Sequence, residues 1–334
     1  MKSHHAPRAV TDAPRAVTDA PRAVTDAPRA VTDAPCPGRR GHSAGVVLIM
    51  CMIMSAPLGL PGCVASDAPD APGEVIAAES FLADIARAVA GPELAVKGLL
   101  PPGIDPHAFQ PRPRDVARLS KARLLLVAGH GYEAWLEPLR GSLAGVEIIG
   151  AFGPVEGAGE DPHFWMDPRN VESALGTIVD ALASVKPQAR ERFSANAAAY
   201  AGRLIDLDAS IRARVASIPA ARRKLLTNHD ALSRYADAYG LSIAGTVLEG
   251  SGDGAEASPR ALARLIATTA KGGAWAIFLD AGEKASLARS IGRETGLKVV
   301  TDLYVEGLSA ASGPAPNYLA MLAHDTEVIV NALR

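Results

Sequence analysis

The sequence predicts an α/β protein with two lobes, each a mostly parallel sheet flanked by helices, joined by one long rigid helix. Short apolar runs alternate with amphipathic stretches in both halves of the chain. Between them, residues 187–217 are rich in Ala, Arg, Leu and Asp, and no proline follows Pro187 until Pro219. Strands that alternate with helices along a chain form parallel sheets that helices cover on both faces.

The first predicted lobe, residues 74–186, begins with a strand followed by a helix. Val75–Ala78 is a short apolar run typical of a buried strand, and Phe81–Ala90 carries apolar residues at helical spacing. The later elements expected in this lobe are a helix that starts over 115–119, a strand at 124–128, a helix at 132–139 and a strand at 146–149.

The connecting helix is predicted over residues 187–218, a length of about eight turns. The second predicted lobe, residues 219–334, repeats the alternation of strands and helices. Its strands are expected at 224–227, 242–247, 274–279 and 298–301, and its helices at 231–239, 259–271, 284–296 and 317–333.

The N-terminal region, residues 1–66, is predicted to direct export of the protein and to add nothing to its folded core. Residues 1–38 contain four identical copies of a seven-residue repeat with a proline in each, which indicates disordered low-complexity sequence. Residues 39–66 have the layout of a secretory signal, with an apolar run shorter than the roughly 20 residues of a spanning helix. Leu60–Cys63 is similar to a bacterial lipobox, whose cysteine is lipidated, and cleavage near Ala65 is the alternative. A periplasmic or membrane-anchored extracytoplasmic protein is expected.

Composition narrows the classes of function. Asp and Glu outnumber Lys and Arg by 36 to 34, so no basic surface for nucleic acid is expected. The three cysteines, Cys36, Cys51 and Cys63, all precede the predicted lobes, which therefore have no thiolate for a metal site. Any metal in the lobes must be held by nitrogen and oxygen.

Three histidines lie in polar motifs. Asp-Pro-His occurs at His107 and again at His163, and His229 lies in Thr-Asn-His-Asp. Imidazole is the commonest neutral metal ligand, and a neighbouring carboxylate can orient its ring. A single loop histidine is usually only solvated, and Asp-Pro also starts turns. Three such histidines near the expected carboxyl ends of strands predict a metal site.

Longer motifs carry a family resemblance. They are Gly103–His107 with Pro111–Asp115, Asp161–Pro168, Thr227–Leu232 and the tail at Asn317–Leu319. In order and spacing they resemble the metal-binding solute receptors of ABC importers, over about residues 74–334. The resemblance implies a receptor, not an enzyme, that captures zinc or manganese outside the cytoplasm and delivers it to a membrane permease. It also implies release through small movements of ligand-bearing loops, because a rigid connecting helix limits a wide hinge motion.

The resemblance further implies four ligands, two from each lobe. The first three positions fall on His107, His163 and His229, and the fourth falls on Glu306, where the family usually has aspartate. Asp302 is the alternative for the fourth position. Asp280 also lies at a predicted strand end, but the family has no ligand there, and a turn or capping role is expected.

Three imidazoles and one carboxylate form a closed tetrahedral set that favours Zn²⁺. Mn²⁺ is the alternative, although receptors tuned to it tend to replace the third histidine with a second carboxylate, a harder oxygen donor. His130 is expected to be structural or solvated, with a place behind the ligands near the cleft as the alternative, and His324, beside Asp325 on the last helix, is expected at the surface. The long histidine-rich loop of some zinc receptors has no counterpart in 152–160.

Two rival functions fit the sequence less well. A zinc hydrolase would leave the fourth coordination position to water, with Glu306 or Asp302 as general base, but the chain has no His-Glu-x-x-His element. A surface adhesin would fit export but would explain none of the histidines. The expected partner is the importer's permease, a metal-donor chaperone remains open, and a monomer is expected.

Overall fold

The computed structural model describes residues 73–104, 106–153, 161–227, 229–246, 274–281 and 286–334, together with Ala267. All of these residues belong to one compact unit that spans 64–334. The predictions for residues 1–66 lie outside the described residues, as does the helix expected at 259–271 apart from Ala267.

The first sheet consists of four parallel strands in the order β2-β1-β3-β4. The strands are β1 (Glu74–Ala77), β2 (Val96–Gly98), β3 (Ala122–Val127) and β4 (Glu147–Gly150). Val75 and Leu124 point into one apolar core, whereas their neighbours Ile76 and Leu125 point into another. Both faces of this sheet are therefore covered, as its near-continuous apolar strands require.

The described part of the chain that contains the first sheet has three α-helices and three 3₁₀ helices. The α-helices are α1 (Ser80–Ala90), α2 (Pro113–Leu119) and α3 (Pro168–Val185), and the 3₁₀ helices are η1 (Gly91–Glu93), η2 (Ala134–Leu143) and η3 (Phe164–Met166). The helix expected at 132–139 is thus a 3₁₀ helix that starts two residues later. Pro138 lies inside it, and proline lacks the backbone N–H that a regular α-helix would use.

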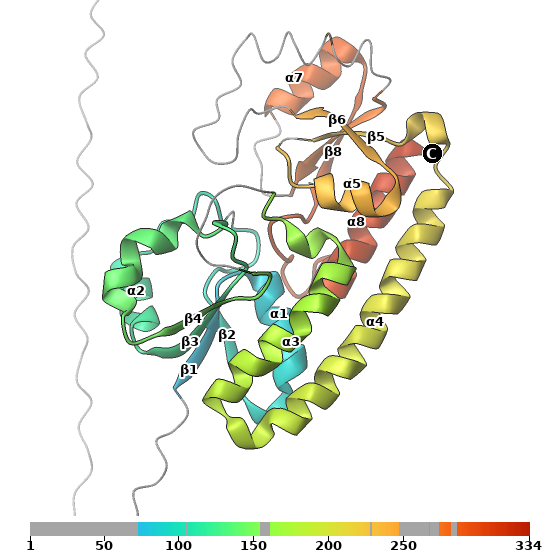
Figure 1. The fold of residues 1–334 in the computed structure, drawn as a ribbon. Coiled ribbons are helices and arrows are strands. Elements are labelled where there is room, and N and C mark those ends of the chain that lie inside the picture. The colour runs from blue at the N-terminus through green and yellow to red at the C-terminus, as the bar shows by residue number, and fades with distance from the viewer. Residues whose placement is uncertain are drawn as a thin grey trace, which may run out of the picture. The chain divides into compact units, whose positions relative to one another are not determined.

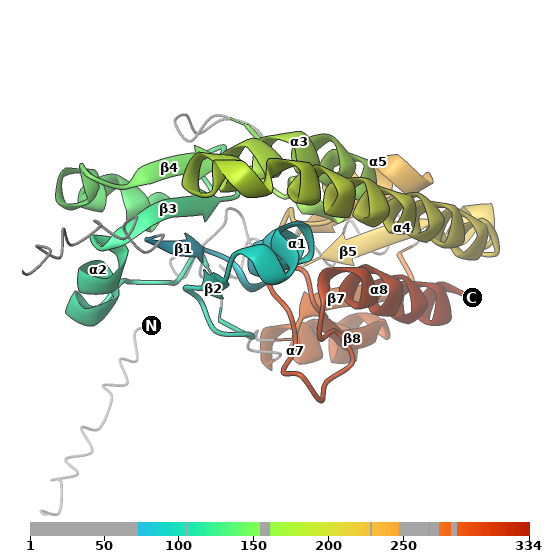
Figure 2. The same ribbon diagram turned by 90° about the horizontal axis from the view of Figure 1, so that it is seen from below.

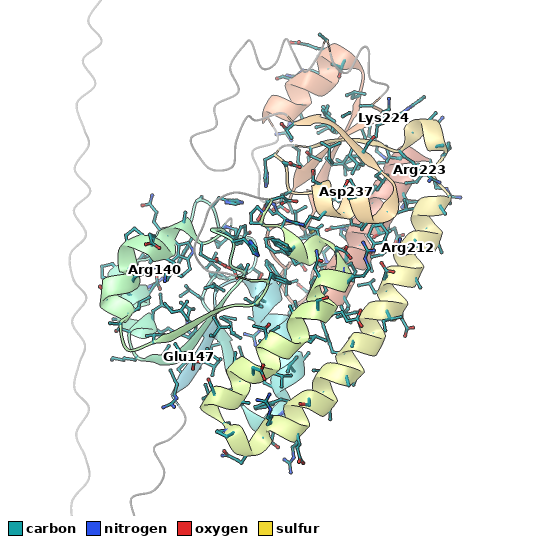
Figure 3. The ribbon with its side chains drawn as sticks, in the orientation of Figure 1. Arg140, Glu147, Arg212, Arg223, Lys224 and Asp237 are labelled. Carbon is teal, nitrogen blue, oxygen red and sulfur yellow. The ribbon has the colours of Figure 1, made fainter. Side chains whose placement is uncertain are left out.

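Helix α3 is an element that the sequence patterns above do not anticipate. It begins at Asp167, whose side chain accepts a hydrogen bond from the backbone N–H of Arg169 at 2.9 Å, and Pro168 occupies its first turn. Asp followed by Pro is a helix-start signal, so the signal for α3 was present in the sequence. Near the other end of α3, Ser184 donates to Glu147 of β4, the residue labelled in Figure 3, at 2.7 Å.

The predicted connecting helix is α4 (Arg190–Ala216), 27 residues long and preceded by the 3₁₀ turn η4 (Pro187–Ala189). It packs against α1 and α3 and continues along α8 and α5 (Figure 1). Arg212 of α4 donates to the carbonyl oxygen of Ala238, next to Asp237, at 2.9 Å (Figure 3). One face of α4 is buried along its whole length, through Phe193, Tyr200, Leu204, Ile211 and Val215.

The second sheet, also all parallel, has the order β6-β5-β7-β8, the same pattern as the first sheet, whose four strands are labelled in Figure 2. Its strands are β5 (Lys224–Thr227), β6 (Ser242–Thr246), β7 (Ala276–Asp280) and β8 (Lys298–Leu303). Its described helices are η5 (Ala220–Arg222), α5 (Ser233–Tyr239), α7 (Ser286–Thr295) and α8 (Tyr318–Leu333). The predicted fold class, two parallel α/β lobes joined by a long helix, is confirmed. The domain boundaries at 186 and 218 stay a prediction.

The half of the molecule that contains the first sheet and the half that contains the second sheet share one apolar core. A single cluster of buried side chains extends from Phe81 through Trp165 to Met321. The indole N–H of Trp165 donates to the carbonyl oxygen of Val305 at 2.8 Å, and the hydroxyl of Tyr318 donates to the carbonyl oxygen of Trp165 at 2.6 Å. These contacts tie the halves together beside the carboxyl ends of their strands. In the part of the chain that the structure describes, no helix is long and apolar enough to cross a membrane.

Candidate metal centre

Four loops that follow strands bring the predicted residues together. His107 lies between β2 and α2, His163 follows β4 and directly precedes η3, His229 follows β5, and Glu306 follows β8. The carboxyl ends of parallel strands meet at one edge of a sheet, and ligands of α/β proteins collect there. Two of the four residues come from each half of the molecule.

One ligand atom from each of these four residues lies within 4.8 Å of the other three. Oε1 of Glu306 is 2.8 Å from Nε2 of His229 and 3.2 Å from Nε2 of His163. Oε2 of Glu306 is 3.8 Å from Nε2 of His107. The centroids of the three imidazole rings are 5.6 to 5.8 Å apart, so the three rings are almost equally far from one another.

Burial and neighbouring charges shift the pKa values of Glu306 and His163 in opposite directions. Glu306 is 4% exposed and His163 is 2% exposed. Burial raises the pKa of Glu306, but the charge and hydrogen bond of His163, with further help from His229 and His107, hold it well below its usual range. Burial lowers the pKa of His163, but Glu306 and Asp161 more than offset this and raise it to about 9. The metal-free site therefore holds a buried imidazolium–carboxylate pair.

Asp161 orients His163. Its Oδ1 accepts from the backbone N–H of His163 at 3.0 Å and lies 2.7 Å from Nδ1 of the ring, so Nε2 is directed at the cluster. This is the role predicted for the carboxylate of the Asp-Pro-His motif. The equivalent Asp105 lies outside the described residues, and its role stays a prediction.

Arg234 of α5 holds the loop that carries Asp161 from the other half of the molecule. Its guanidinium donates to the carbonyl oxygen of Asp161 at 2.6 and 3.0 Å and lies 3.6 Å from the centroid of the Phe164 ring. A planar guanidinium can make both contacts at once, which a lysine cannot do. The His163 loop is therefore fixed both by its own carboxylate and by α5.

Two carboxylates hold the backbone that leads to Glu306. Asp325 of α8 accepts from the N–H of Tyr304 at 2.9 Å, and Asp280 accepts from the N–H of Val305 at 2.6 Å. Asp280 thus binds the backbone of the segment before Glu306, and the turn or capping role expected for it stays a prediction. Among the described residues, neither Asp280 nor Asp302 belongs to the four-residue cluster.

Tyr132 is a site residue that the sequence analysis missed. Its hydroxyl donates to Oε2 of Glu306, and its ring lies edge-on to His107 at 4.9 Å between centroids. Burial and the negative charges of Glu306 and Glu79 raise the pKa of Tyr132 well above its usual value, so the phenol stays protonated. No local pattern marks a tyrosine that is 174 positions away from its partner in the chain.

The two remaining candidate histidines have other roles. His130 has a positive φ of 54°, stacks on Phe164 with 4.4 Å between ring centroids, and lies with Nε2 3.0 Å from the carbonyl oxygen of Phe152. Nε2 of His324 on α8 is 2.9 Å from the carbonyl oxygen of Asp302. His130 thus has a structural role, one of the roles left open for it, whereas His324, expected at the surface, bonds to the backbone, and neither belongs to the cluster.

Residues 75–332 match the model of the family described as "ZnuA: Zinc-uptake complex component A periplasmic". The chain belongs to this family. It is therefore a metal-binding solute receptor of an ABC importer and not an enzyme, and the hydrolase hypothesis is discarded.

Curated relatives in the ZnuA family are named for different metals. The chain is 27% identical over 292 residues to the manganese-binding lipoprotein MntA of Halalkalibacterium halodurans, covering 84% of this chain and 97% of that protein. It is 29% identical over 273 residues to the zinc-binding protein TroA of Treponema pallidum, covering 78% and 88%. It is also 29% identical over 266 residues to the iron-binding protein YfeA of Yersinia pestis, covering 77% and 85%. Relatedness alone therefore leaves the metal undecided.

Solved structures agree on the fold. The periplasmic zinc-binding protein TroA of Treponema pallidum superposes with a TM-score of 0.72 at 27% identity, covering 79% of this chain and 99% of that one. The manganese-bound periplasmic metal-binding protein of Candidatus Liberibacter asiaticus superposes with a TM-score of 0.69 at 23% identity, covering 78% and 99%. The second comparison supports the fold alone.

Proposed function

We propose that this protein captures one zinc ion with His107, His163, His229 and Glu306 and delivers it to the permease of an ABC importer. The observation that carries the proposal is the convergence of these four side chains from four separate loops, with one ligand atom from each inside a 4.8 Å cluster. Three of them are imidazoles, which bind metals through a neutral nitrogen, and the fourth is a buried carboxylate.

The distances between the ligand atoms of the cluster suit an ion with tetrahedral coordination. Zinc binds nitrogen and carboxylate oxygen at about 2.0 to 2.2 Å, which sets the edges of a tetrahedron at about 3.4 Å. The distances from Oε1 of Glu306 to Nε2 of His229 and to Nε2 of His163, 2.8 and 3.2 Å, are close to that value. All four ligand atoms lie within 4.8 Å of one another, so the four side chains already face a common point.

Manganese is the alternative cargo, because MntA is named for manganese and is related over most of both chains. The donor set favours zinc. Imidazole suits zinc, whereas carboxylate, carbonyl and water oxygens suit manganese, and this cluster has three imidazoles and one carboxylate. Iron, for which YfeA is named, also binds imidazole. Like manganese, however, it is commonly held by more than four ligands.

We place the receptor outside the cytoplasm, anchored through a lipid on Cys63 or free in the periplasm after cleavage near Ala65. Support comes from the signal-like sequence of residues 39–66 and from relatives that are named as lipoproteins or periplasmic proteins. The partner would be the permease of the importer.

Elemental analysis of the purified protein and a competition titration with zinc and manganese test the proposal. We expect one zinc per chain and a preference for zinc over manganese. His107→Ala, His163→Ala and His229→Ala should each weaken zinc binding by at least about a hundredfold while the fold remains intact, because each change removes a nitrogen ligand and the water that takes its place is a weaker ligand than imidazole. His324→Ala, which removes a histidine outside the cluster, is the matched control. A wild-type stoichiometry of zero, or unchanged affinity in all three cluster variants, would refute the proposal.

A further inference from the structure

The two oxygens of the Glu306 carboxylate face different partners. Oε1 lies between two imidazoles, 2.8 Å from Nε2 of His229 and 3.2 Å from Nε2 of His163. Oε2 accepts a hydrogen bond from the hydroxyl of Tyr132 and lies farther, 3.8 Å, from Nε2 of His107. A carboxylate only accepts hydrogen bonds, so the phenol is the donor in this pair.

The position of the Tyr132 hydroxyl is set by packing on all sides. Tyr132 is 2% exposed, and its ring lies edge-on to Trp165 at 4.7 Å and to His107 at 4.9 Å between centroids. The next residue, Glu133, accepts from the backbone N–H groups of Ala128 and Gly129 at 2.5 and 3.2 Å, which fixes the loop between β3 and η2. The ring of Trp165 and the Glu133 contacts, which lie outside the four-residue cluster, therefore help to fix the position of the hydroxyl.

We propose that Tyr132 is a positioning residue that occupies Oε2 of Glu306, leaves Oε1 as the only carboxylate oxygen for the metal, and thereby favours four-coordinate zinc over manganese. The inference rests on the proposed function, since it assigns a specificity role at that same site. Tyr132 itself does not touch the metal.

The chemical reason lies in the coordination number. Zinc is satisfied by four ligands in a tetrahedron, which three imidazoles and one carboxylate oxygen supply. Manganese prefers about six mostly oxygen ligands. If both oxygens of Glu306 could bind, the site would offer a fifth ligand and a second hard donor, and its disadvantage for manganese would shrink. A hydrogen bond that holds one oxygen away from the ion keeps the carboxylate monodentate.

The test compares Tyr132→Phe with Tyr235→Phe in titrations with Zn²⁺ and with Mn²⁺. Tyr235 is a buried tyrosine whose hydroxyl is 2.8 Å from Oγ1 of Thr326, away from the cluster, so its variant loses a buried hydroxyl without touching Glu306. For Tyr132→Phe we expect zinc affinity to fall about tenfold, as for other losses of a partner that orients a ligand, with manganese affinity unchanged or higher. The ratio of zinc to manganese affinity should thus fall at least about tenfold in Tyr132→Phe and stay at the wild-type value in Tyr235→Phe.

Optical spectra of the Co²⁺-loaded proteins supply a second measurement. Four-coordinate cobalt has intense visible bands, and five-coordinate cobalt has weaker ones, so Tyr132→Phe should lose intensity relative to wild type and to Tyr235→Phe. Equal loss of both metals in Tyr132→Phe, or a cobalt spectrum like that of wild type, would overturn the proposal. If the wild-type protein bound no zinc, the proposed function itself would fail, and that failure would already be visible without any variant.

Discussion

At the level of single residues, the charges of His163 and Glu306 balance each other in the metal-free site, and zinc must replace the proton of His163 to bind. The pKa of His163 is raised to about 9 mainly by Glu306 and Asp161, against the opposing effect of burial. Below that pH the ring carries a proton in the metal-free protein. Zinc needs the neutral ring, so binding must expel this proton.

We therefore predict that zinc binding at pH 7.5 releases about one proton per ion and that affinity rises with pH up to about 9. Affinity rises with pH because the pKa of His163 is raised: the proton that competes with zinc is bound below pH 9 and lost above it. Glu306 stays ionised throughout this range because its pKa is lowered. Calorimetry in two buffers of different ionisation enthalpy measures the proton count. A binding enthalpy that is the same in both buffers at pH 7.5 would contradict this prediction.

A second prediction concerns the carboxylate that orients His163. Asp161→Asn removes the charge whose Oδ1 lies 2.7 Å from Nδ1 of the ring, and we expect zinc affinity to fall by about 10- to 100-fold. Asp206→Asn on the exposed face of α4 is the matched control. The orienting role would be wrong if the two variants bound zinc equally well in competition titrations.

A third prediction concerns the fourth ligand. Glu306→Ala should weaken zinc binding by less than any of the three histidine changes, because water can fill the fourth position of a zinc site. Asp302→Ala should be nearly silent, since Asp302 does not belong to the cluster. The same competition titrations rank these variants, and an Asp302→Ala loss larger than that of Glu306→Ala would reverse the assignment.

At the level of elements, the start of α3 positions the His163 segment. Asp167 caps the helix four residues after His163, and its side chain accepts from the N–H of Arg169. Loss of such a cap costs about 1 kcal/mol of folding free energy. We predict that Asp167→Ala lowers the free energy of unfolding by about that amount. Urea denaturation of Asp167→Ala beside Glu172→Ala, an exposed position of α3, measures it, and equal stabilities would argue against the cap.

The comparison of sequence with structure shows which elements local patterns reveal. Apolar runs predicted β1, β3 and β5 to within about two residues, and the run without proline predicted α4. Strand β2, only three residues long, carries too short a pattern, and the capped start of α3 was overlooked. The histidines stand out because their motifs are local. The Tyr132–Glu306 bond depends on the folded arrangement of both halves, which no local pattern encodes.

At the level of the whole molecule, the two halves are bound to each other more tightly than a hinge would allow. One apolar core spans both, and hydrogen bonds cross between them from Trp165 to Val305, from Leu308 to Ser80 and from Tyr318 to Asp84. Helix α4 packs against helices of both halves (Figure 1). Loading and release are therefore expected to use small movements of the four ligand-bearing loops.

This rigidity predicts that the radius of gyration of residues 64–334 changes by less than about 1 Å when zinc binds, as in other pre-organised complexes. Small-angle X-ray scattering of zinc-loaded protein and of protein treated with a chelator measures the difference. His163→Ala, which should not load, controls for effects of the ion on the buffer. A contraction of several ångströms on loading would indicate a hinge instead.

The central claim is that one zinc ion is held by four specific side chains, and crystals grown with zinc test it most directly. Diffraction recorded on both sides of the zinc absorption edge locates the ion without assumptions about its ligands. We predict a single peak within about 2.0 to 2.2 Å of one atom each of His107, His163, His229 and Glu306. A peak bonded to Asp302 or Asp280, with Glu306 turned away from it, would contradict the assignment.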